Sequence, residues 1–163
     1  PASAAASSAA PVAGASAAAP TAAPVLPPGV AAGILQVASV NDRLSRSAAA
    51  LRAALGDRAS GAGEIAPLLR KIAADVRSGD QAARRLAAWS PANELVADVT
   101  TLYGATAASA ADGLAAPLAA RGAYRTAGWH MLKVLAALPG VAKATSALAA
   151  EAGVALPEAA TNP

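Results

Sequence analysis

The segment from Gly122 to Gly140, GAYRTAGWHMLKVLAALPG, constrains the fold of this chain more than any other. Its apolar positions recur at steps of four and three residues, at Tyr124, Gly128, Met131, Leu135 and Leu138. Residues at these steps lie above one another on one face of an α-helix. The segment therefore predicts an amphipathic helix between Pro117 and Pro139 that buries one stripe in a core.

The composition favours helices in the rest of the chain as well. About a third of the residues are alanine, phenylalanine is absent, and the aromatic residues are two Tyr and two Trp. Alanine has the highest helix propensity, and the β-branched residues that favour strands are sparse. A core of Ala, Leu, Val and Ile suits helices that approach one another closely. We expect an all-α fold with a single core of modest size.

Hydrophobic periodicity predicts two helices before residue 90. The first runs from Val30 to Leu55 and ends at Gly56, a residue type that is common just after a helix. The second begins near Glu64 to Pro67, because proline is tolerated in the first turn of a helix. We expect it to be kinked or interrupted at residues 78–80, Ser-Gly-Asp.

Turn residues mark the boundaries of the later helices. Ser90 and Pro91 predict the start of the third helix, with the serine as N-cap and the proline at the first helical position. This helix is expected to end at Asp112-Gly113, and the fourth at Pro139-Gly140. A short fifth helix follows, over about residues 142–152. Helices of this length with short connections pack as antiparallel neighbours, which predicts an antiparallel four-helix bundle.

The first 29 residues differ from the rest of the chain. They carry no charge and consist almost wholly of Ala, Pro, Ser and other small residues, with prolines that block a continuous helix. Such a segment is typical of a disordered linker, and a tail of this kind becomes ordered when it is bound to a larger assembly. The expected organisation is a tail over 1–29, the bundle over 30–138, and a short helix with a flexible C-terminus over 139–163.

Charge and hydropathy argue against nucleic-acid binding and membrane insertion. The formal net charge of +3 is spread along the chain, and no basic run is longer than a pair such as Arg84-Arg85, whereas nucleic-acid binders carry dense basic patches. The longest uncharged stretch outside the tail, about residues 25–41, is interrupted by Pro, Gly, Gln and Ser. It is too polar and broken for a transmembrane span. We therefore expect no nucleic-acid partner and no transmembrane segment.

The sequence offers little for catalysis or ligand binding. It contains one histidine, His130, and no cysteine, and it lacks the spacings of the common hydrolase, metalloprotease and nucleotide-binding motifs. Metal sites in helical bundles use Glu-x-x-His pairs, but no glutamate stands three residues before His130. His130 and Met131 point about 100° apart on a helix, so they cannot ligate one haem iron from opposite sides. We expect a protein that is not an enzyme, with no catalytic, cofactor or metal site.

Five residues are candidate contacts for a protein partner instead. Trp129 lies off the apolar stripe beside His130, and Trp89 stands just before Ser90-Pro91. In a chain poor in aromatics, a tryptophan off the core face is a candidate interface anchor. The alternative is that each tryptophan covers one end of the core. Arg84 and Arg85 either lie on a solvated helix face or dock on an acidic surface.

Two segments of the later helices have a pattern found in a known family. Residues 95–103 read LVADVTTLY, and residues 124–138 have an aromatic opening and the closing run Val134-Leu135-Ala136. They resemble the third helix, with its leucine spacing and central aromatic residue, and the final helix of the PsbQ family, the extrinsic subunits on the lumenal side of photosystem II. Residues 69–86 match the second-helix region, and the resemblance covers residues 35–138.

The resemblance implies a non-catalytic accessory subunit in the thylakoid lumen. Such a subunit docks on lumenal protein and supports oxygen evolution by helping to retain the calcium and chloride of the manganese cluster, without binding these ions itself. Its tail would reach into the complex. Two other functions stay open on the residues alone. One is an exported bacterial envelope or adhesion bundle on an Ala/Pro/Ser linker, in the periplasm or at the cell exterior. The other is a phasin-like protein that coats a surface.

Overall fold

The computed structural model of the chain describes residues 25–115 and 121–157, and within them it confirms the all-α fold. The tail up to residue 24, Pro117 and residues 158–163 lie outside the described residues. Five α-helices and one 3₁₀ turn follow one another: α1 (Val30–Gly56), α2 (Ala62–Leu86), η1 (Ser90–Ala92), α3 (Asn93–Ala115), α4 (Arg121–Leu135) and α5 (Leu138–Glu151).

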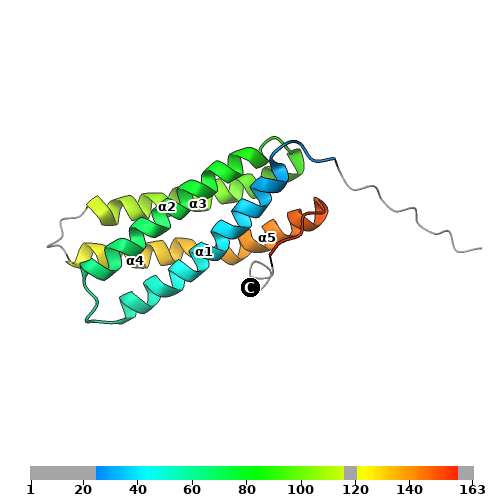
Figure 1. Ribbon diagram of the computed structural model, residues 1–163. Coiled ribbons are helices and arrows are strands. Elements are labelled where there is room, and N and C mark those ends of the chain that lie inside the picture. The colour runs from blue at the N-terminus through cyan, green and yellow to red at the C-terminus, as the bar shows by residue number, and fades with distance from the viewer. Residues whose placement is uncertain (1–24, 116–120, 158–163) are drawn as a thin grey trace, which may run out of the picture.

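The helices form a four-helix bundle in which α2, α3 and α4 each reverse the direction of the helix before (Figure 1). α1 packs on α2, α2 on α3 and α3 on α4, and both α4 and α5 contact α1, which closes the bundle. α4 and α5 run in the same direction and together occupy the fourth position (Figure 1). The helix expected at residues 142–152 therefore begins earlier, at Leu138, and continues the line of the fourth helix after a short turn.

The stripe predicted for the fourth helix is buried as expected. Tyr124, Met131, Leu135 and Leu138 are each at most 4 % exposed, and Gly128 is buried between them. α5 extends this stripe into the same core with a further set of buried residues: Val141, Thr145, Leu148 and Ala149. Proline at position 139 does not end the segment, because it lies in the first turn of α5, where its missing N–H has no intrahelical acceptor.

Glycines allow the helices to approach at several points, and Gly79 in α2 is the closest of them. A Cβ at this position would lie 2.1 Å from Cε2 of Tyr103 in α3. The expected kink or interruption at residues 78–80 is wrong, since α2 is continuous from Ala62 to Leu86. A glycine stands here because the tyrosine ring lies directly against the helix backbone.

Three further predicted boundaries need correction. α2 begins at Ala62, so Pro67 is its sixth residue and not part of its first turn. Proline leaves the carbonyl of Gly63 without an intrahelical donor. Because Pro67 and Gly63 are both exposed, water can hydrogen-bond to that carbonyl. Ser90 is not the N-cap: Trp89 takes that position without a side-chain capping bond, and Ser90 is the first residue of the 3₁₀ turn. α3 continues past residues 112–113 to Ala115, because Gly113 is buried against Ala127 and Leu69.

Candidate functional site

Trp129 and His130 both lie on the outside of α4. The side chain of Trp129 is 46 % exposed, and His130 is exposed beside it. Exposure follows from helical phase, since Trp129 follows the buried Gly128 by one residue and precedes the buried Met131 by two. Both side chains are therefore accessible to a partner, and their role as contacts stays a prediction.

The exposed residues of α4, of α5 and of the turn between them form a surface that we call the α4–α5 outer face. Two exposed lysines lie on it among residues that are mostly small or apolar. Its members are Gly122, Thr126, Trp129, His130, Lys133, Ala136, Ala137, Pro139, Gly140, Lys143, Ala147, Ala150 and Glu151.

This helix also bears on the expectation that no segment crosses a membrane. Among the described residues, the segment Gly122–Glu151 is the one helix long and apolar enough to do so by length and composition. The expectation of no transmembrane segment rested on residues 25–41 and not on this segment. In the bundle, 39 % of its most apolar 18-residue window is buried, so much of an apolar helix faces outward.

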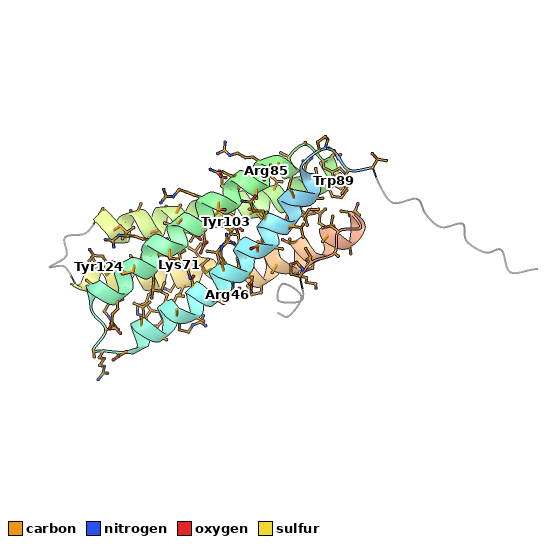
Figure 2. All side chains as sticks on the ribbon, in the orientation of Figure 1. Arg46, Lys71, Arg85, Trp89, Tyr103 and Tyr124 are labelled. Atoms are coloured by element: carbon orange, nitrogen blue, oxygen red, sulfur yellow. The ribbon has the colours of Figure 1, made fainter. Side chains whose placement is uncertain are left out.

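The other three predicted contacts belong to the end of α2: Arg84 and Arg85 are in its last turn, and Figure 2 shows Arg85 and Trp89 at that end of the bundle. Trp89 is half-buried and packs against the core, which agrees with a tryptophan that covers one end of the bundle. Arg84 donates to Oδ2 of Asp80 from Nε at 3.0 Å and from Nη2 at 2.9 Å. Arg85 donates from Nη1 to Oε1 of Gln36 in α1 at 3.1 Å. The structure thus separates the five predicted residues into two groups.

A buried chain of hydrogen bonds crosses the bundle, and sequence reasoning missed it. The hydroxyl of Tyr103 in α3 donates to Oδ1 of Asn41 in α1 at 2.8 Å. Nδ2 of Asn41 donates to Oγ1 of Thr145 in α5 at 3.3 Å, and that hydroxyl donates to the Val141 carbonyl at 2.7 Å. All three side chains are at most 3 % exposed. Because a buried polar group without a partner is costly, this chain fixes the relative position of three helices.

Burial also affects the acidity of the tyrosine. Removal from water raises the pKa of Tyr103 well above its ordinary value of about 10; the positive charge of Arg43 lowers it and the carboxylate of Asp75 raises it. Arg43 and Asp75 form an ion pair of 2.7 Å between α1 and α2. Tyr103 therefore stays protonated as a hydrogen-bond donor at neutral pH.

Arg125 in α4 binds the end of α1. Its guanidinium donates to the carbonyl of Leu55, and its Nη1 donates to the carbonyl of Asp57 at 3.2 Å. The last carbonyls of a helix lack intrahelical donors and carry partial negative charge, so a cation there is stabilising. An open pocket of about 380 Å³ lies beside it, lined by residues 58–62, Ile65 and Arg125.

Asn41, Tyr103 and Thr145 therefore join one helix to another, whereas the buried Thr106 and Ser109 donate to carbonyls of their own helix. Within the described residues, no three His, Asp or Glu side chains gather as a metal site would require. Comparison of the chain with protein-family models, with curated proteins and with solved structures returns no match. The α4–α5 outer face is the candidate functional site, because it combines an exposed tryptophan with an apolar helix surface.

Proposed function

We propose that this protein is a non-catalytic accessory subunit that docks on a larger assembly through the α4–α5 outer face. The observation that carries the proposal is the exposure of Trp129. A tryptophan buries a large area when a partner covers it and is a frequent anchor of protein interfaces. Here a tryptophan is 46 % exposed in a chain that has only two.

The bundle is well suited to a docking role. The stripe on one side of the fourth helix holds it in the core, while the opposite side carries Trp129, His130 and a row of small residues. Small residues let another surface approach the helix backbone closely. Because the helix is fixed by core packing, the docking face is preorganised, and little ordering cost accompanies binding.

The resemblance to the PsbQ family makes photosystem II the candidate assembly, with the thylakoid lumen as the location. The subunit would then support oxygen evolution by its position on the complex. The test is rebinding of the purified chain to photosystem II membranes that have been washed with salt. We expect stoichiometric rebinding and a lower chloride requirement for oxygen evolution. A chain that neither rebinds nor changes the chloride requirement contradicts this assignment.

Variants test the docking face itself. Trp129→Ala is expected to weaken rebinding at least tenfold, because truncation of a central aromatic anchor typically costs 2 kcal/mol or more. Leu35→Ala is the matched control, since Leu35 is a 38 % exposed apolar side chain on α1 and not on the α4–α5 outer face. Equal rebinding by Trp129→Ala and the unaltered chain would remove the outer face from the proposal.

A further inference from the structure

The α4–α5 outer face combines apolar surface with unpaired positive charge. Lys133 and Lys143 are both exposed on it, and Glu151 at its far end is the one acidic residue between positions 121 and 151. The ion pairs that the structure gives for its described residues lie on α1 and α2, so neither lysine forms an ion pair within this part of the chain.

The charge of the neighbouring helices makes the molecule asymmetric. α3, which packs on α4, contains Glu94, Asp98 and Asp112 and neither lysine nor arginine. α1, which also packs on α4 and α5, contains one acidic residue and three arginines. Arg43 and Arg46 form ion pairs with Asp75 and Asp42, so the exposed Arg52 is the positive charge that α1 adds to this side. A negatively charged surface is therefore attracted to the side formed by α1, α4 and α5 and repelled from α3.

We propose that the α4–α5 outer face lies on an anionic lipid surface, with the helix axis parallel to the membrane plane. This inference rests on the proposed function, because it names the partner of the same docking face. The assembly of the proposed function includes the bilayer around its proteins, and that bilayer is the surface that the face contacts. The argument is one of complementarity: lysines match acidic headgroups, and the apolar residues match the acyl-chain boundary.

The side chains fit the interfacial region of a bilayer. Tryptophan combines a large apolar ring with one N–H donor and is enriched where apolar and polar layers of a membrane meet. Lysine extends its charged end into the headgroups while its methylene stem covers apolar surface. Apart from the lysines and Glu151, three side chains on this face can form directional hydrogen bonds, those of Thr126, His130 and Trp129. A fluid lipid surface requires no such bonds.

The buried stripe explains why the helix lies on the surface and does not cross it. Tyr124, Met131 and Leu135 are within the bundle core, and Thr145 is hydrogen-bonded to Asn41. A spanning helix would have to leave this core and break that bond. An interfacial helix uses its outer face and keeps both.

The experiment uses the full chain and protein-free vesicles of equimolar phosphatidylglycerol and phosphatidylcholine, with pure phosphatidylcholine vesicles for comparison. A Trp89→Phe background leaves Trp129 as the single tryptophan. We expect a blue shift of Trp129 emission and co-sedimentation with the anionic vesicles, weakened by salt and absent with the neutral ones. Alkaline extraction should release the bound protein. Equal binding to both vesicle types, no binding to either, or resistance to alkaline extraction overturns the proposal.

Lysine variants locate the contact. Each of Lys133→Gln and Lys143→Gln is expected to weaken vesicle binding about fivefold, since one lysine near an anionic surface contributes that factor. Lys71→Gln makes the same change on the exposed side of α2 and should alter binding less than twofold. An equal loss from Lys71→Gln contradicts the assignment of the face. A chain that rebinds photosystem II membranes but ignores anionic vesicles overturns this inference alone, whereas failure in both assays removes the proposed function too.

Discussion

Replacing Gly79 with alanine tests the packing of the bundle at its closest contact. In most helix interiors this substitution stabilises, because alanine has a helix propensity up to about 1 kcal/mol better than that of glycine. Here the added Cβ would lie 2.1 Å from Cε2, 2.8 Å from Cζ and 3.0 Å from Cδ2 of Tyr103. The ring cannot move away freely, since its hydroxyl is bonded to Asn41 at 2.8 Å.

The expected sign follows from comparing these effects. Overpacking of a close contact costs roughly 1–3 kcal/mol, and withdrawal of the ring would leave the buried Asn41 oxygen without its donor at a further cost of about 1–3 kcal/mol. These costs exceed the gain in helix propensity. We expect Gly79→Ala to lower the free energy of unfolding by about 2 kcal/mol.

Urea denaturation followed by circular dichroism at 222 nm measures the change. Gly104→Ala is the matched control, because a Cβ at this exposed glycine of α3 meets no atom within 4 Å. It should stabilise the bundle by about 0.5–1 kcal/mol. In a Tyr103→Leu background the clash is absent, so Gly79→Ala should no longer destabilise. A Gly79→Ala variant as stable as the unaltered chain, or equally destabilised in both backgrounds, would refute the packing argument.

Three further predictions concern the polar contacts. Tyr103→Phe should lower the free energy of unfolding by about 1–2 kcal/mol, measured by urea denaturation, because it leaves the Asn41 oxygen buried without a donor. Since burial raises the pKa of Tyr103 in the folded state, its contribution to the free energy of unfolding is fully present below pH 10 and is lost as the pH rises. The free energy of unfolding should therefore fall above pH 10 by up to about 1.4 kcal/mol per pH unit. Tyr103→Phe should remove this part of the alkaline decline. Arg125→Met should destabilise by about 1–2 kcal/mol, because the carbonyls at the end of α1 lose a charged donor. Unchanged urea midpoints, or the same alkaline decline with and without Tyr103, would contradict these expectations.

The sequence was sufficient to predict the elements whose signal is local and periodic. The steps of four and three from Tyr124 to Leu138 place those residues on one face whatever the helix packs against, and that face is buried. The same phase places Trp129 outside. By contrast, Trp89 adjoins a turn, where helical phase no longer applies. The sequence was equally consistent with Trp89 as a partner contact and as a cover for one end of the core.

Contacts between distant residues could not be predicted in the same way. Gly79 was interpreted as a possible kink because local propensity disfavours glycine in helices, whereas its role depends on Tyr103, a residue of another helix. The sequence did contain one sign of the buried hydrogen bonds, since Asn41 is a polar residue between the buried Val40 and Leu44. Its partners depend on which helices lie opposite, and the sequence does not state that.

Pro139 was misjudged for a related reason. Proline commonly follows a helix, but it is equally acceptable in the first turn of the next one. The two cases differ only in whether the following residues have a core to pack against. Here Val141 and Leu148 pack in the core that α1 and α3 share with the fourth helix, so α5 continues the bundle.

Accessibility of Trp129 in the free and bound states tests the central claim most directly. In a Trp89→Phe chain, acrylamide quenching of tryptophan fluorescence should be efficient in solution, because the side chain is 46 % exposed. After binding to salt-washed photosystem II membranes, we expect the quenching constant to fall severalfold, since the α4–α5 outer face is then covered. Quenching that is unchanged in the bound protein would show that another surface makes the contact.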